Sequence, residues 1–95
     1  MKAYELLYFV APTTEDDVRA AVQTRIETVV KDAKGQIDNV EDWGRRKLAY
    51  EVNGLTDADY ILVDFHTDPT NIAELDRVLR ITDAVARHMI VARTD

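Results

Sequence analysis

The feature that most constrains the fold is the order in which two hydrophobic periodicities alternate along the chain. Apolar residues recur at helical spacing from Val18 to Ala33 and again from Ile72 to Leu79, as expected for helices that bury one stripe. Runs rich in strand formers precede, separate and follow these two segments. The sequence therefore predicts the order strand, helix, strand, strand, helix, strand.

Local signals place the ends of these elements. Thr13 or Thr14 is the expected N-cap of the first helix, and Gly35 is expected to close it. Asp68 and Pro69 are typical of a cap and a first helical residue. The expected strands cover residues 2–10, 36–52, 60–65 and 85–92, and the expected helices cover residues 15–34 and 69–80.

The second strand is long, and its alternation is interrupted. Leu48 and Tyr50 alternate cleanly with their neighbours, but the first half of the strand does not keep the same parity. A bulge near Gly44 is the simplest explanation. A turn beginning at Asn53–Gly54, with an acidic loop to Asp59, is expected to follow.

Two helices that each carry one apolar stripe must share one face of the sheet. With this order of elements, the prediction is a single α+β domain over residues 1–95. It is a two-layer sandwich of the ferredoxin-like type, whose antiparallel four-stranded sheet has the spatial order 4-1-3-2. The other face of the sheet is left open.

Charge is distributed unevenly along this acidic chain. The formal net charge is -6, and no Lys or Arg occurs between Glu51 and Asp76. Arg45, Arg46 and Lys47 nevertheless stand side by side. A phosphate responds to the local field, which is screened within ~8 Å at physiological salt. The basic triplet is therefore compatible with binding to nucleic acid despite the negative net charge.

The strand pattern gives the triplet an expected orientation. If Leu48 and Tyr50 face the core, Arg45 and Lys47 fall on the open face of the sheet, provided that the bulge permits it. Arg87, on the last strand, is expected to join them there. Arginine can bind phosphate oxygens through two parallel hydrogen bonds, so this side is the candidate contact surface.

The aromatic and apolar residues are compatible with two different uses of the open face. Tyr60 and Phe65 have opposite parity on one strand, so the sequence predicts contact with phosphates and RNA shape rather than stacking of bases. The alternative is a ferredoxin-like dimerisation or small-molecule-sensing module, whose partner would cover an apolar patch. That patch would consist of Leu7, Phe9, Met89 and Val91.

The sequence offers no residue set for catalysis or for a metal. It has no cysteine, and acids do not complete a metal site around His66 or His88. A nucleophile elbow and a phosphate-cradling glycine loop are also missing. The apolar runs fall far short of the ~20 residues of a membrane span, and no signal-peptide pattern occurs. We expect a cytoplasmic protein without enzymatic activity, small-molecule substrate, cofactor, metal or membrane partner.

Three blocks, in this order and spacing, carry a resemblance that covers nearly the whole chain: "YELLYFVAP", "WGRRKLAYEV" and "LDRVLRITDAVARHMIV". They resemble the bacterial small-subunit ribosomal protein S-six family, written S6 below. The resemblance implies the same ferredoxin-like fold and a structural role in the small ribosomal subunit, without catalysis. It also implies binding to small-subunit rRNA together with the partner ribosomal protein S-eighteen, written S18 below.

The resemblance also implies roles for single residues. The positions expected to contact rRNA or to help place it are Lys2, Arg45, Arg46, Lys47, Arg80, Arg87 and Arg93, where Arg93 would compensate for Ala92 at a position often basic in the family. Trp43 and Tyr60 are expected to pack on RNA or on the partner protein, and we assign them to the partner, whereas core packing is the expected fate of Tyr4. One departure is the pair Ala58-Asp59, which replaces a glycine-aromatic pair and makes this segment more acidic.

Overall fold

The computed structural model describes residues 1–52 and 54–93 and confirms the predicted order of elements. The elements are β1 (Lys2–Val10), α1 (Asp16–Asp32), β2 (Gln36–Val52), β3 (Leu55–Thr67), the 3-10 turn η1 (Pro69–Asn71), α2 (Ile72–Arg80) and β4 (Val85–Ala92). Three strands have the predicted bounds. The third strand is longer than predicted, and the second helix is divided into η1 and α2.

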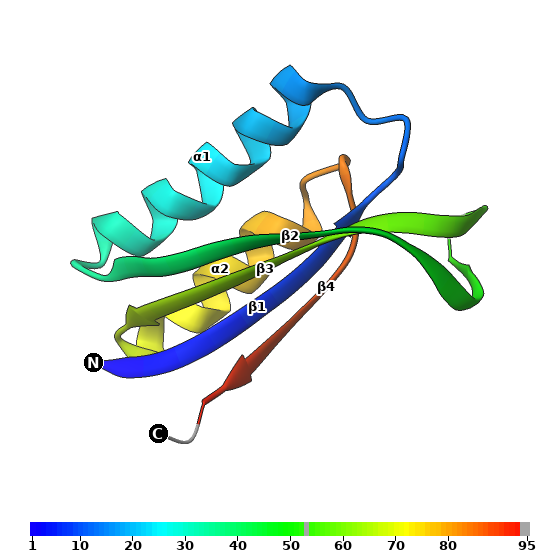
Figure 1. Cartoon of the computed structure of the whole chain (residues 1–95). Coiled ribbons are helices and arrows are strands. Elements are labelled where there is room, and N and C mark those ends of the chain that lie inside the picture. The colour runs from blue at the N-terminus through cyan, green and yellow to red at the C-terminus, as the bar shows by residue number, and fades with distance from the viewer. Residues whose placement is uncertain (53, 94–95) are drawn as a thin grey trace.

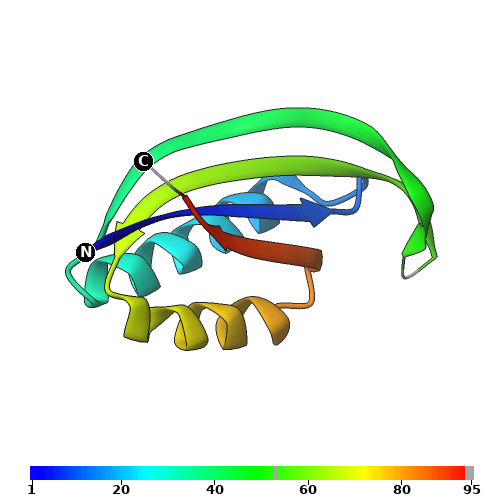
Figure 2. The ribbon, with the colours of Figure 1, turned by 90° about the horizontal axis from the view of Figure 1, so that it is seen from below.

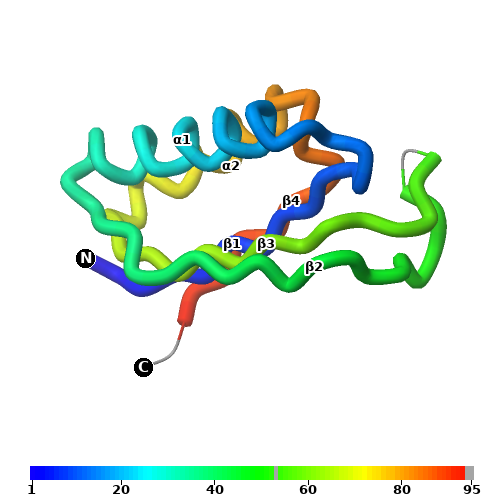
Figure 3. Tube along the Cα trace, turned by 45° about the horizontal axis from the view of Figure 1, so that its top comes forward, coloured from blue at the N-terminus to red at the C-terminus, as the bar shows by residue number. Residues whose placement is uncertain are grey.

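Within the described residues, the strands form one antiparallel sheet in the order β2-β3-β1-β4, as the sequence predicts. Both helices cover the same face of this sheet (Figures 1 and 2). Figure 3 shows the two layers from another direction, with the helices above and the strands below. The second face of the sheet is not covered by either helix, and we call it the open face.

Strict alternation along β1 fixes which side of the sheet meets the helices. Leu6, Tyr8 and Val10 are buried, whereas the residues between them are only partly buried. Tyr4 also joins the core and stacks on Phe65, with 5.7 Å between the ring centres. Each such side chain contributes about 1.5–3 kcal/mol when fully buried. β3 adds Ile61, Val63 and Phe65 to the core, and the helices add Val22, Ile26, Val30, Leu75 and Leu79.

The start of α1 differs from the prediction. Glu15, rather than Thr13 or Thr14, occupies the N-cap position, and it makes no side-chain cap hydrogen bond. The backbone N–H of Thr14 instead donates to the carbonyl of Ala11 at 2.9 Å, in the turn that leads out of β1. Asp16 and Asp17 lie in the first turn, where the helix dipole favours negative charge.

Gly35 ends α1 by close approach of the backbone. Its N–H donates to the Val30 carbonyl at 2.9 Å. A Cβ atom at this position would collide with the carbonyl oxygen of His66 and would lie 2.9 Å from Cγ1 of Val30. Lys34 carries the positive φ, 62°, in this turn. A glycine is therefore required for space rather than for its dihedral angle.

The entry to the second helix follows the prediction at its cap. The Asp68 carboxylate accepts a hydrogen bond from the backbone N–H of Thr70 at 2.9 Å and another from its hydroxyl at 2.8 Å. The backbone hydrogen bond is the main reason that the pKa of Asp68 lies below its usual value. Pro69 follows the cap, but it begins a short 3-10 turn before α2 starts at Ile72.

The hairpin of β2 and β3 extends past the rest of the sheet (Figure 1). β1 pairs with β3 only as far as Asp59, so residues 45–52 of β2 and 55–58 of β3 form a two-stranded arm. The acidic stretch predicted as a loop is therefore part of a strand. Asn53, with which the predicted turn begins, lies outside the described residues, and Gly54 has a φ of 81°.

The pairing of β2 with β3 has a first register shift between Ile37 and Asn39, and two further shifts lie beyond it. One lies between Asp42 and Gly44, where Gly44 has a φ of 75°, so the predicted bulge is confirmed. The other lies within the arm, where residues 48–51 of β2 stand opposite the single residue Thr56 of β3. The surplus residues of β2 curve the arm toward the open face.

Candidate nucleic-acid interface

One row of paired residues crosses the sheet next to the arm. Gly44, Tyr60, Phe9 and Arg87 stand opposite one another on β2, β3, β1 and β4. The rings of Phe9 and Tyr60 are stacked, with 4.6 Å between their centres and 8° between their planes. The row therefore places an aromatic pair and a guanidinium on the same side of the molecule.

The open face is largely apolar beside this row. The patch named from the sequence, Leu7, Phe9, Met89 and Val91, alternates with core residues on β1 and β4. Met89 is 55% exposed. An apolar surface of this kind marks a place where a partner can bind.

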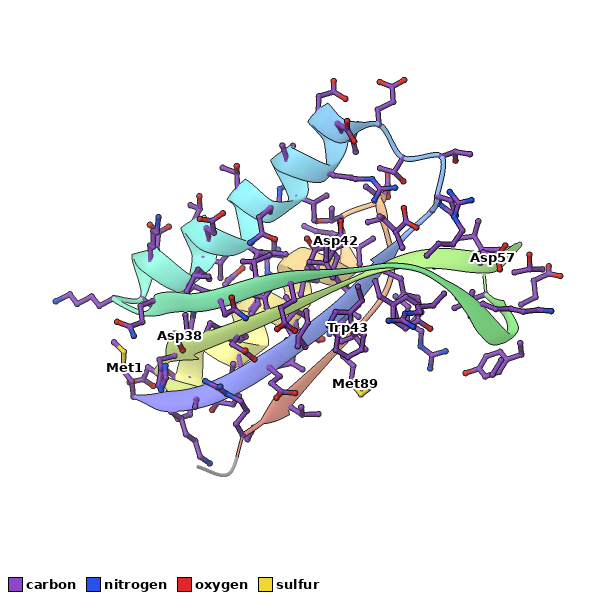
Figure 4. The ribbon with its side chains drawn as sticks, in the orientation of Figure 1. Met1, Asp38, Asp42, Trp43, Asp57 and Met89 are labelled. Carbon is purple, nitrogen blue, oxygen red and sulfur yellow. The ribbon has the colours of Figure 1, made fainter. Side chains whose placement is uncertain are left out.

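Trp43 occupies the bulge of β2 and lies on the open face. Figure 4 shows Trp43 and Met89 on the side of the sheet away from the helices, and Asp42 on the helix side. Trp43 is 41% exposed, and its Nε1–H donates to a carboxylate oxygen of Glu41 at 3.1 Å. The Asp42 carboxylate accepts from the backbone N–H of Gly44 at 2.8 Å, which fixes the bulge.

The first member of the basic triplet is turned toward the helix layer. Arg45 stands opposite Asp59, with 3.7 Å between Nε and Oδ1. The other oxygen of Asp59 accepts from Arg19 on α1 at 2.5 Å. Lys47 pairs with Asp57, two residues further along both strands, and therefore has the same orientation as Arg45. The expectation that Arg45 and Lys47 lie on the open face is wrong, because it assumed that Leu48 and Tyr50 face the core.

The other two members of the triplet are exposed and uncompensated. Arg46 stands opposite Ala58, and Lys47 stands opposite Asp57. Neither side chain makes an ion pair with any residue that the structure describes. Their charge is thus available to a ligand, which is the property that the sequence predicted for this segment.

Arg87 reaches from β4 to the arm. Its Nη1–H donates to the hydroxyl of Tyr50 at 2.8 Å, and its guanidinium carbon lies 6.0 Å from the centre of the Tyr50 ring. This is the geometry of a cation–π contact. A phenol does not neutralise the guanidinium, so Arg87 also keeps its positive charge.

Arg93 and Lys2 lie at the end of the sheet away from the arm. The backbone N–H of Arg93 donates to the Ala3 carbonyl at 2.9 Å, which places Arg93 beside the start of β1. Its guanidinium lies 3.4 Å from the Asp38 carboxylate and 3.9 Å from that of Asp64. Lys2 is exposed and makes no ion pair within residues 1–52 and 54–93.

Arg80 lies on α2, in the helix layer. Its guanidinium is paired with Asp76, whose other oxygen lies 2.6 Å from Nε2 of His88. The hydrogen bond from His88, followed by that from Arg80, holds the pKa of Asp76 below its usual value. The structure therefore brings Arg46, Lys47 and Arg87 to the end of the molecule that carries the arm, whereas Arg80 lies in the helix layer.

Sequence reasoning missed two aromatic contributions. Tyr50 was expected to face the core, but it is 64% exposed on the arm. Tyr60 was compared with Phe65 on its own strand, whereas its partner is Phe9 on the neighbouring strand. The register of β1 with β3 would have shown this pairing, but the sequence alone does not give a register.

The described residues hold no cluster of three or more metal-ligating side chains. Among the same residues, neither helix has the length and apolar character needed to cross a membrane.

Comparison with known proteins points to one family. The family model described as Ribosomal protein S6 matches residues 3–92. The chain is 42% identical over 93 residues to the small ribosomal subunit protein bS6 of Clostridium botulinum, covering 98% of this chain and 99% of that one. It is 36% identical over 91 residues to the protein of the same name from Desulforamulus reducens, covering 96% of each chain.

Solved structures agree with this similarity. The crystal structure of 30S ribosomal protein S6 from Thermotoga maritima matches with a TM-score of 0.88 and 31% identity, over 97% of this chain and 87% of that chain. The C-terminal domain of the MgtC protein from Mycobacterium tuberculosis matches with a TM-score of 0.65 at 10% identity, over 98% of this chain and 88% of that one. The second match reflects the fold alone.

Proposed function

Because the chain belongs to the ribosomal protein S6 family, and so is a structural component of the small ribosomal subunit rather than an enzyme, we propose that it binds small-subunit rRNA together with the partner protein S18. Its place of action is the ribosome in the cytoplasm. The fold, the unpaired cations and the apolar open face support a division of this task between an RNA-binding end and a partner-binding face.

The observation that best supports RNA binding is that cations next to and on the arm are not paired with carboxylates. Arg46 and Lys47 are exposed without an ion pair among the described residues, and Arg87 is held by a phenol. Each cation that meets a phosphate releases condensed counterions, which favours binding. These three residues therefore contribute most of the electrostatic attraction in this proposal.

The remaining predicted RNA contacts differ in whether the side chain already faces a carboxylate. Lys2 is unpaired within the described residues and supplies a second, separate contact at the other end of the sheet. The guanidinium groups of Arg45, Arg80 and Arg93 already face carboxylates. A phosphate would have to compete with these carboxylates, so each of the three adds less to RNA affinity than Arg46 does.

The partner part rests on the exposed apolar surface beside the bulge. Trp43 is 41% exposed on the open face, and Tyr60 stands opposite the neighbouring Gly44. Tryptophan and tyrosine are enriched among the residues that dominate binding at protein interfaces. S18 would cover this part of the open face, and Trp43 would be its main anchor.

The test is a salt titration of binding to a fragment of small-subunit rRNA in the presence of S18. The double change Arg46→Ala, Lys47→Ala should weaken binding and should reduce the slope of log K against log salt by about 0.7–0.9 for each phosphate that no longer meets a cation. Lys31→Ala, which removes an exposed cation from α1, is the matched control. Unchanged affinity and slope in the double variant would refute the assignment of the arm.

A second variant tests the proposed contact with S18. Trp43→Ala should abolish most of the gain in RNA affinity that S18 provides, while binding without S18 stays at the level of the unmodified chain. An equal loss with and without S18 would show that Trp43 contacts RNA instead.

A further inference from the structure

A pocket lies between the arm and the open face. Its volume is about 230 Å³, and it is lined by Phe9, Leu48, Ala49, Tyr50, Val52, Tyr60, Arg87 and Met89. Residues from all four strands meet here because the arm curves over the end of the sheet (Figure 1). Water occupies about 30 Å³ per molecule, so this space has the volume of several waters and is large enough for a small ring.

The lining has a composition that the rest of this chain does not suggest. Three of the eight lining residues are aromatic and one is an arginine, whereas none is an acid. The whole chain carries 18 acids among 95 residues. A pocket with flat π-surfaces and a cation, but without a carboxylate, suits a ligand that is itself flat and anionic.

The pocket also adjoins the unpaired cations. Arg87 forms part of the wall, and Arg46 and Lys47 lie on the same arm as Tyr50, four and three residues before it in the chain. The exposed ring of Tyr50 stands over the guanidinium of Arg87, while the Phe9–Tyr60 pair lies at the base of the arm. A ligand that enters the pocket would therefore meet the guanidinium of Arg87 in the wall, with further cations on the same arm.

From these observations we infer that the pocket receives one unpaired nucleobase of RNA, which stacks on Tyr50 while the flanking phosphates meet Arg46, Lys47 and Arg87. This inference rests on the proposed rRNA binding and adds a base contact to it. Bases that are free of a duplex stack on aromatic side chains and on arginine planes, and this contact tolerates different bases. The expected contribution is thus to affinity rather than to sequence preference.

An apolar protein segment is the less suitable occupant. It would remove the charged group of Arg87 from water without offering a negative partner, and such burial is costly. A nucleotide offers a phosphate to the same guanidinium and a flat ring to the tyrosine. Charge complementarity therefore favours RNA over an apolar peptide at this site.

The test compares Tyr50→Leu with Tyr50→Phe in binding to the small-subunit rRNA fragment together with S18. Tyr50→Leu should weaken binding roughly 5- to 150-fold, the range expected for one base stacked on one ring. The slope against salt should stay constant, because the cations that meet phosphate are all retained. Tyr50→Phe keeps the ring and should retain most of the affinity. RNA that carries 4-thiouridine should cross-link to the peptide containing Tyr50.

The outcomes separate this inference from the function on which it rests. Full affinity in Tyr50→Leu, together with weak binding in the Arg46→Ala, Lys47→Ala variant, would overturn the base pocket and leave rRNA binding intact. Equal losses in Tyr50→Leu and Tyr50→Phe would assign the effect to the hydrogen bond with Arg87 and would also overturn it. A loss of S18 binding without RNA in Tyr50→Leu would make the pocket a protein-docking site.

Discussion

Asp59 links the stability of the fold to the charge of the arm, so its replacement by asparagine has two opposite expected effects. Its carboxylate is shared by Arg19, at 2.5 Å, and by Arg45, at 3.7 Å. The Asp59 side chain is 14% exposed, that of Arg19 23% and that of Arg45 63%. Asp59→Asn keeps the shape of the side chain but removes its charge.

The burial of these groups sets the magnitude of the stability loss. An exposed ion pair contributes about 0.2–1 kcal/mol, whereas breaking a fully buried pair costs about 3–5 kcal/mol. Arg19 retains bonds to the carbonyls of Thr14, Ala11 and Pro12 after the change. We therefore expect a loss of about 1–2 kcal/mol, which lowers the Tm by roughly 5–15 °C in a domain of this size.

The same change should strengthen RNA binding. Without the carboxylate, Arg45 is released, and the arm gains a third cation that can meet phosphate. Affinity for the rRNA fragment should rise, and its dependence on salt should become steeper by about 0.7–0.9 in log–log slope. Thermal unfolding followed by circular dichroism and a salt titration of RNA binding measure the two effects on one preparation.

Asp57→Asn is the matched control, because it removes the same charge from the same strand. Asp57 makes no ion pair with the residues that the structure describes, so its replacement should leave the Tm nearly unchanged. Equal Tm values for the two variants would refute the structural role of Asp59. Weaker RNA binding by a fully folded Asp59→Asn protein would refute the idea that Asp59 restrains Arg45.

Three further predictions concern stability. Gly35→Ala should cost about 1–3 kcal/mol in urea unfolding, as overpacking does, because its Cβ meets the backbone carbonyl of His66; full stability would contradict the close approach. Burial raises the pKa of Tyr8 to about 12, so stability should be complete below about pH 10 and should fall as the pH rises toward about 12, a loss that Tyr8→Phe should reduce. The lowered pKa of Asp76 should contribute stability above about pH 4 that is lost in acid, and in His88→Leu an NMR titration should find this pKa shifted upward.

The architecture was predictable because each element carries its own local signal. Alternation along residues 2–10 and 85–92, and helical spacing from Val18 to Ala33, gave the type and order of the elements. The open face followed from two helices that each bury one stripe. Its apolar patch was also identified, because alternate residues on a strand share a face.

The arm was not predictable in the same way. Its residues pack against little of the core, so burial does not impose an alternating pattern on them, and the acidic stretch up to Asp59 has the composition of a loop. The bulge at Trp43 then changes the parity of everything that follows in β2. Arg45 was placed on the wrong side because its orientation was inferred from Leu48 and Tyr50, whose alternation on the arm does not mark the face that meets the core.

The ion pairs of the charged residues were also not predictable from the sequence. Arg45 and Arg46 are neighbours with the same side chain, yet only Arg45 meets a carboxylate among the described residues, and that carboxylate comes from the next strand. The pairing of His88 with Asp76 also joins residues that are distant in the chain. Local composition indicates where cations gather, but the free ones are known only when the strands have been paired.

The position of β1 inside the sheet affects how a newly made chain can fold. β1 is synthesised first, yet it lies between β3 and β4, and β4 is the last element of the order. Until residues 85–92 have left the translating ribosome, one edge of β1 has no partner for its backbone hydrogen bonds. A nascent chain of this topology therefore completes its sheet late, and during that time its exposed strand edge is open to chaperones and to neighbouring chains.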